Sequence, residues 1–188
     1  PRLYTAIDKA VVLCSQTLNY VSSGTPELKI SHFHLRELIV EVAVAIRDEI
    51  TVGVEKAVLD SHPGFNVINE VEFELDIKAD RDQLFRAISN LVMNARQIGA
   101  SLVRVTAEKS ESSVVIEVSD DGPGMSGLAR KKLFQPFAGS SRDGGTGLGL
   151  IIVRDILRAH GGDATLVSAT EEGTTFRLVI AKLEEDVT

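Results

Sequence analysis

The chain has almost no cysteine and no long hydrophobic run. Cys14 is the single cysteine among 188 residues, so an internal disulfide and a zinc site built from several cysteines are both excluded. The longest apolar run, residues 148–153, is far shorter than the stretch of about 20 residues that spans a bilayer. Residues 1–24 mix apolar and polar positions, which disfavours a signal peptide. We therefore expect a globular, cytoplasmic fragment that makes no membrane contact itself, although the full-length protein could be membrane-anchored.

Positive charge is also scarce. Lys and Arg number 20 against 27 Asp and Glu, which gives a net charge of −7. Such a balance argues against binding to nucleic acid or to anionic membranes as the main activity. The length fits one domain, or one domain with an appendage, and is sufficient to bury a core without disulfides or metal.

The spacing of apolar residues predicts several helices. Over residues 1–22 apolar side chains recur every three or four positions, and a segment with Ser, Gly and Pro ends the pattern. A second helix is expected over 35–46. A third begins at the capping-box-like Asp80–Gln83. A short helix over 128–133 and a longer one over 150–159 follow, the latter ended by His160 and two glycines.

Alternating residues predict the strands. Over 65–79, Val71, Phe73, Leu75 and Ile77 alternate with charged residues, which predicts one strand with these four side chains buried. Two hairpins are expected, one joining 103–107 to 114–118 and one joining 164–168 to 176–180. The set favours a mixed α/β layer fold with hairpin connections over a doubly wound parallel sheet.

Two glycine clusters nearly match common nucleotide motifs. Residues 122–127 fit G-x-G-x-x-G, but no second parallel strand ending in an acid follows, so a Rossmann site is rejected. Residues 139–146 have the spacing of a P-loop, but Gly145 stands where the phosphate-binding lysine is required.

The same residues suit a different nucleotide site. Asp120 ends a strand just before a glycine turn, where a carboxylate can accept a hydrogen bond from an exocyclic amine. Residues 145–150 open a helix whose first N–H groups can bind phosphate. Asn90 and Asn94 share a helix face, and amide oxygens suit Mg²⁺. Taken alone, the glycine turn is more often only a turn, the asparagine pair is more often solvated, and the glycine-rich run is more often a tight helix entry without a ligand. All three features in this order favour a nucleotide-binding site.

Four segments in this order resemble the ATP-binding domains of histidine kinases. Asn90–Ala95 resembles their N box, Asp120–Met125 the G1 box, Leu133–Phe137 the F box and Gly145–Leu150 the G2 box. The resemblance covers about residues 30 to 182. It implies the α/β fold of the GHKL superfamily, a two-layer sandwich (Bergerat-type) with a mixed sheet and helices on one face, preceded here by an N-terminal helix.

The resemblance also implies roles for particular residues. Asp120 would bind the adenine amino group, Asn94 would hold Mg²⁺ and Asn90 would support it. Residues 138–144 would form an ATP lid, in which Arg142 is either a γ-phosphate contact or a solvated residue. Thr174 would close the adenine side. The full set of cofactor-binding residues implied is Asp120, Gly122, Gly124, Met125, Phe137, Gly145, Thr146, Gly147, Leu148, Gly149 and Thr174.

Some positions depart from the family pattern. Gln97 stands where many members have a basic or aromatic residue. The hydrolysing relatives have a Glu as general base four residues before the Mg²⁺-binding Asn, where this chain has Asn90, so phosphoryl transfer is favoured over hydrolysis. None of the four histidines, His32, His34, His62 and His160, lies in an H-E-x-x-x-P-like segment.

The sequence therefore predicts a two-component sensor histidine kinase fragment. Residues 1–24 would be a remnant of the dimerisation and phosphoacceptor helices, and residues 25–188 the catalytic domain. The domain would bind Mg·ATP and transfer the γ-phosphate to a histidine outside the chain. Its partners would be a phosphoacceptor histidine domain and a response regulator receiver domain, within a homodimeric full-length protein. Two alternatives remain open: a degenerate docking module that binds a response regulator without catalysis, and an anti-sigma-type serine kinase.

Overall fold

The computed structural model describes residues 27–52, 64–135 and 147–182, with side chains of α2 described as far as Ile46. The helix expected over 1–22 lies outside these ranges. The elements, in chain order, are β1 (Ile30–His34), α2 (Leu35–Val52), β2 (Asn66–Asn69), β3 (Asp76–Asp80), α3 (Arg81–Gln97), β4 (Leu102–Lys109), β5 (Ser113–Asp120), α4 (Gly127–Lys131), α5 (Gly149–Ala159), β6 (Asp163–Thr170) and β7 (Gly173–Ala181).

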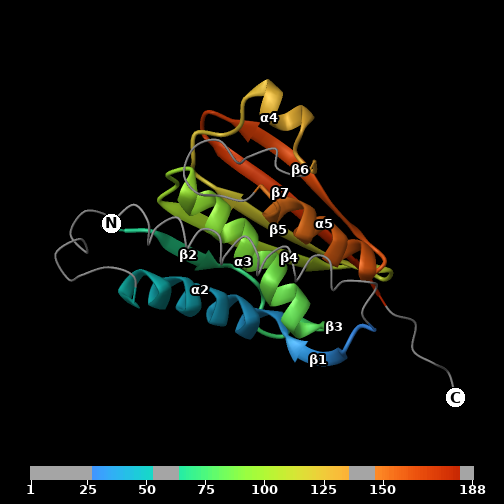
Figure 1. Cartoon of the computed structure of the whole chain (residues 1–188). Helices are drawn as coiled ribbons and strands as arrows, with labels where there is room; N and C mark the ends of the chain where they lie inside the picture. Colours follow the sequence, from blue (N-terminus) through green and yellow to red (C-terminus); the bar gives the residue numbers. More distant parts are fainter. Residues whose placement is uncertain (1–26, 53–63, 136–146, 183–188) are drawn as a thin grey trace, which may run out of the picture.

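A five-stranded mixed sheet forms one layer, in the order β2-β4-β5-β7-β6. β2 pairs with β4 in parallel, and the other neighbours are antiparallel. A second sheet is the antiparallel pair β1–β3. Helices α2, α3 and α5 lie on one side of the large sheet (Figure 1). The predicted α/β sandwich with helices on one face is confirmed. None of the described helices is long and apolar enough to cross a membrane.

Helix α3 lies at the centre of the helical layer. Its N-cap is Asp80, whose Oδ1 accepts a hydrogen bond from the Gln83 N–H at 3.1 Å, as the capping sequence predicts. The stripe predicted from spacing is buried, and it packs against the inner face of the sheet in one continuous core. The fully buried side chains of α3, α5 and the large sheet include Leu84, Ile88, Val92, Val103, Ile116, Leu157 and Leu178.

The prediction of a single strand over residues 65–79 is wrong. The chain forms β2 and β3 in different sheets, since β2 pairs with β4 and β3 pairs with β1. A turn separates them, and Phe73 lies in that turn with 70% of its surface exposed, stacked on His34 at 6.2 Å between ring centroids. Val71, Leu75 and Ile77 are buried as expected. Alternation alone could not reveal the change of sheet.

The ends of two helices also differ from expectation. Helix α2 continues to Val52, six residues beyond the predicted end. His32 and His34, expected at a helix entry, belong to β1, which leads directly into α2.

His160 joins the C-terminus of α5 to the N-terminus of α3. The side chain is buried, its Nδ1 lies 2.8 Å from the Ile156 carbonyl oxygen, and its Nε2 lies 3.0 Å from the Asp80 backbone N. The Asp80 N–H can only donate and the carbonyl can only accept, so the ring is neutral with its proton on Nδ1. The two helices therefore run antiparallel and are fixed at this end.

Candidate nucleotide-binding site

The two asparagines of α3 face the first residue of α5. A Cβ built on Gly149 would lie 3.4 Å from Asn90 Oδ1 and 3.6 Å from Asn94 Oδ1. Both side chains are partly exposed, so they border on solvent as well as on α5. These are ordinary contact distances, so both amides lie beside the start of α5, as the sequence predicts for a shared face.

The start of α5 presents unsatisfied backbone donors. Its N-cap, Leu148, makes no side-chain capping hydrogen bond. The first bond of the helix runs from the Ile152 N–H to the Leu148 carbonyl at 3.0 Å. The N–H groups of residues 149–151 have no acceptor among the described residues, and they lie at the positive end of an 11-residue helix. This terminus suits a phosphate group.

Asp120 lies at the end of β5, in the middle of the large sheet. Its Oδ1 accepts hydrogen bonds from the Gly122 N–H at 2.9 Å and the Thr174 N–H at 3.3 Å. Its Oδ2 accepts none from the residues that the structure describes. Burial raises the pKa of the Asp120 carboxyl, and nearby Asp121 adds to this, against the lowering effect of the two backbone bonds. A half-buried carboxylate with an open oxygen suits a hydrogen-bond donor such as an aromatic amine.

Thr174 provides a second open polar atom beside Asp120. The two residues are paired in the register of β5 and β7. Thr174 is 1% exposed, and its Oγ1 has no hydrogen-bond partner among the described residues. A buried hydroxyl without a partner costs about 1–3 kcal/mol, and a ligand or an ordered water at this position would remove that cost.

The glycines after Asp120 have different roles. A Cβ on Gly122 would lie 2.9 Å from Asp120 Oδ1 and 3.1 Å from Ile98 Cδ1, so this glycine lies between the carboxylate and an apolar side chain. Gly124 has φ of +70°, and its Cβ would lie 1.9 Å from the Thr170 carbonyl oxygen. Gly124 therefore allows the turn to pack against the end of β6, while Gly122 allows Asp120 and Ile98 to lie close to the backbone of the turn.

Ile98 is a site residue that the sequence reasoning missed. It caps the C-terminus of α3, four residues and about one turn after Asn94, and 42% of its surface is exposed. An exposed isoleucine beside Gly122 provides an apolar surface for a planar ring. Its position one helical turn after Asn94 was the sequence feature that could have identified it.

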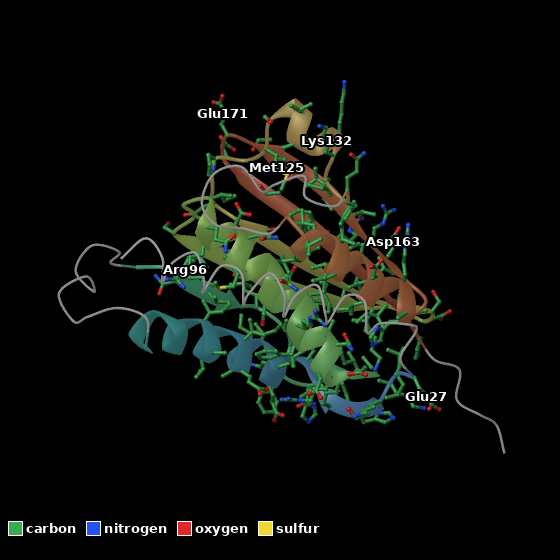
Figure 2. The ribbon with its side chains drawn as sticks, viewed as in Figure 1. Glu27, Arg96, Met125, Lys132, Asp163 and Glu171 are labelled. Carbon is green, nitrogen blue, oxygen red and sulfur yellow. The ribbon has the colours of Figure 1, made fainter. Side chains whose placement is uncertain are left out.

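Other predicted residues lie nearby or outside the described ranges. Met125 is partly buried against the core, and Leu148 is buried. Figure 2 shows Met125 close to α4, whereas Arg96, in the last turn of α3, lies at the left of the view. Phe137, Gly145, Thr146, Arg142 and the lid predicted over 138–144 lie outside the described residues. The basic residues Arg130, Lys131 and Lys132 are exposed.

Arg154 holds the segment after α4 against α5. Its guanidinium donates to both carboxylate oxygens of Asp163, at 2.9 and 3.1 Å, and lies 4.7 Å from the centroid of the Phe134 ring. Asp163 raises the pKa of Arg154, and Arg154 lowers the pKa of Asp163. This contact fixes the F-box-like segment near α5.

The residues present fit Mg²⁺ only together with a nucleotide. Within the described ranges, no group of three or more His, Cys, Asp or Glu could hold a metal ion. The Asn94 amide oxygen is one hard ligand, and Mg²⁺ commonly combines one or two protein oxygens with waters and substrate phosphates. The donor set is therefore suitable for a metal that arrives with phosphates.

Residues 79–184 match the family described as "Histidine kinase-, DNA gyrase B-, and HSP90-like ATPase". The chain belongs to this ATPase family. Among curated relatives of this ATPase domain, the signal transduction histidine-protein kinase AtoS of Escherichia coli (strain K12) is 34% identical over 140 residues, which is 72% of this chain and 22% of AtoS. Sensor histidine kinase ZraS from the same strain is 38% identical over 105 residues, 55% of this chain and 22% of ZraS. The chain thus spans about a fifth of these relatives.

Solved structures of histidine kinases share the fold of this ATPase domain. The nucleotide-free catalytic domain of ThkA has a TM-score of 0.64 and 28% identity, covering 82% of this chain and 99% of that one. ThkA in complex with the response regulator protein TrrA gives a TM-score of 0.71 and 27% identity, over 96% of this chain and 49% of that one. Full-length ShkA in complex with AMPPNP has a TM-score of 0.77 and 23% identity, covering 98% of this chain and 38% of that one. At this identity the likeness shows the fold alone.

Proposed function

We propose that this chain is the ATP-binding catalytic domain of a two-component sensor histidine kinase, which transfers the γ-phosphoryl group of ATP to a histidine outside the chain. The observation that supports this most directly is the position of Asn90 and Asn94 beside the uncapped start of α5. It places amide oxygens beside backbone N–H donors, the combination that a triphosphate with its metal requires. The family match and the kinase relatives agree with it.

Each group of the site has a proposed task. The open oxygen of Asp120, Oδ2, accepts a hydrogen bond from the adenine amino group, and Gly122 and Ile98 lie beside the base. Thr174 Oγ1 donates to a ring nitrogen directly or through water. The first N–H groups of α5 bind phosphate oxygens. Asn94 holds Mg²⁺, which neutralises phosphate charge when bound, and Asn90 orients Asn94 and its ligands.

The rate would come from positioning and charge stabilisation, because phosphoryl transfer requires little covalent chemistry from the protein. Asn90 is a neutral amide that cannot accept a proton from water. The domain is therefore built to deliver the phosphoryl group to another nucleophile. The remaining site residues of the sequence analysis stay in this proposal: Gly124, Met125, Phe137, Gly145, Thr146, Gly147, Leu148, Gly149 and, for the γ-phosphate, Arg142.

The wider assignment is part of the same proposal. Residues 1–24 would belong to the dimerisation and phosphoacceptor helices and 25–188 to the catalytic domain of a homodimeric kinase. The receiving histidine would lie in a phosphoacceptor domain, and a response regulator would take the phosphoryl group next. The ThkA–TrrA complex supports the second partner. The domain would work in the cytoplasm, where ATP is available.

Calorimetry of the chain with ATP and GTP, each with and without Mg²⁺, tests nucleotide binding. We expect ATP to bind at least tenfold more tightly than GTP, which is a difference of about 1.4 kcal/mol, because guanine has a carbonyl where adenine has the amine. Equal affinities would refute the role of Asp120. No binding of either nucleotide would favour the docking module.

Transfer is tested by mixing the chain with γ-labelled ATP and a separate phosphoacceptor domain. Acid-labile, base-stable label on that domain indicates phosphohistidine and supports the proposal. Steady release of phosphate without an acceptor would instead indicate a hydrolase, and acid-stable label on a protein serine would indicate a serine kinase.

A further inference from the structure

Asp121, next to the predicted adenine-binding residue, forms an unusually complete set of hydrogen bonds for an exposed side chain. Its Oδ1 accepts from the Ser101 N–H and the Leu102 N–H, both at 2.8 Å, and its Oδ2 accepts from the Ser101 hydroxyl. Its own N–H donates to the Leu102 carbonyl at 3.2 Å. The hydroxyl bond is the main cause that lowers the pKa of the Asp121 carboxyl. These four bonds fix the turn after β5 to the segment that joins α3 to β4.

That segment includes Ile98, which lies beside Gly122. The Ile98 N–H donates back to the carbonyl of Asn94, and the Ala100 N–H donates to the carbonyl of Ala95 at 3.0 Å. Ile98 is therefore fixed to the end of α3. Because Asp121 bonds to Ser101 and Leu102, three and four residues after Ile98, it links the positions of β5 and of the α3 end.

The two linked parts meet at Gly122. A Cβ on that glycine would lie 2.9 Å from Asp120 Oδ1 and 3.1 Å from Ile98 Cδ1, so Asp120 and Ile98 lie on either side of Gly122 and a change in their separation would move both. The oxygens of Asp121 bond to residues 101 and 102 and not to this glycine. The effect of Asp121 on a ligand must therefore act through the positions of Asp120 and Ile98.

We propose that Asp121 is a positioning residue for base recognition, which sets the separation between the Asp120 carboxylate and the Ile98 side chain. The proposal rests on the adenine role given to Asp120 above. It is a statement about geometry, so the shape of the side chain at position 121 matters more than its charge. An Asn oxygen can accept the same two backbone bonds, whereas a Glu is one methylene too long to keep them.

A matched pair of variants separates shape from charge. In Asp121→Asn we expect ATP affinity within about twofold of the parent chain. In Asp121→Glu we expect about tenfold weaker binding and a smaller preference for ATP over GTP, a factor comparable to one net hydrogen bond. Glu111→Ala, an exposed acid in the β4–β5 turn, is the control and should change neither quantity. Affinities are compared at a temperature where urea unfolding shows each variant fully folded.

Amide hydrogen exchange without nucleotide provides a readout that does not depend on ATP binding. In Asp121→Glu, exchange should become faster at Ser101 and Leu102, and also at Gly122 and Thr174, whose N–H groups bind Asp120. The inference would be overturned if exchange became faster only at Ser101 and Leu102. It would also be overturned if Asp121→Glu kept normal ATP affinity while Asp121→Asn lost ATP affinity. If the parent chain binds no ATP but exchange at Gly122 responds, the proposed function fails while the positioning contact stands.

Discussion

Replacing Gly124 with alanine should lower both the stability of the domain and its affinity for ATP. The backbone at Gly124 has φ of +70°, which costs an L-residue about 1–2 kcal/mol. The new Cβ would also lie 1.9 Å from the carbonyl oxygen of Thr170 and 2.7 Å from its carbonyl carbon. Ordinary contacts begin near 3.5 Å, so one backbone segment must move by more than about 1 Å.

The magnitude follows from adding these two effects. Overpacking of this kind costs about 1–3 kcal/mol, and with the strain we expect the free energy of unfolding of Gly124→Ala to fall by about 3 kcal/mol. With a urea m-value of about 2 kcal/mol/M, the midpoint would fall by about 1.5 M. Because Asp120 and Asp121 belong to the same turn, ATP affinity should fall as well.

Two other glycines separate strain from contact. Gly99 has φ of +92° with open space around its Cβ position, and Gly127 has open space and no positive φ. Gly99→Ala should cost only the strain, about 1 kcal/mol, and Gly127→Ala should be neutral or slightly stabilising because it lies at the start of α4. Urea unfolding of the three variants is the measurement. Equal midpoints for Gly124→Ala and Gly99→Ala would refute the reasoning, because the Thr170 contact would then have no effect.

Three further predictions concern the site and its support. As pH falls through the raised pKa of Asp120, its carboxylate is protonated and ATP binding should weaken, whereas Asp120→Asn should bind weakly at every pH in calorimetric titrations. A raised pKa in the folded state means that folding favours the protonated form, so the ionised carboxylate lowers the stability of the domain at neutral pH. At neutral pH, Asp120→Asn should therefore unfold at an equal or higher urea concentration than the parent chain. This difference should become smaller as the pH falls. Asn94→Ala should reduce the dependence of ATP affinity on Mg²⁺ with little change in urea midpoint, and an unchanged Mg²⁺ dependence would rule out the metal role. Arg154→Met and Phe134→Leu should be non-additive in urea unfolding, by about 0.5–1 kcal/mol, and strict additivity would contradict the stacked contact.

Much of the fold was predictable because most segments show one clear period. The α3 stripe, its Asp80 cap and both hairpins followed from spacing and turn chemistry. The failure over 65–79 has a physical cause. The alternation of apolar and charged residues begins at Val71 and continues through the turn into β3, so it cannot show that the chain leaves one sheet for another, and Phe73 was placed in the core when it lies in an exposed turn.

For the site, the sequence indicated which chemical groups could bind a ligand but not which contacts hold those groups in position. Asp120, Asn90 and Asn94 could be named because carboxylates and amides at those spacings suit a nucleotide. The supporting contacts depend on tertiary packing, as the bonds of Asp121 to Ser101 across 20 residues show. Gly124 was assigned to the base, whereas its neighbour in space is the backbone of Thr170. Such close approaches have no periodic signal.

The antiparallel arrangement of α3 and α5 has a consequence for how the site responds to ligands. The two helices are joined at one end through His160 and Asp80, residues 80 positions apart, and at the other end Gly149 lies beside Asn90 and Asn94. Such contacts form only when the whole domain has folded, so a nucleotide held there stabilises the entire cooperative unit. At a ligand concentration 100 times its Kd, the gain would be about 2.7 kcal/mol. Occupancy of the site would therefore slow global unfolding and proteolysis far from the phosphates.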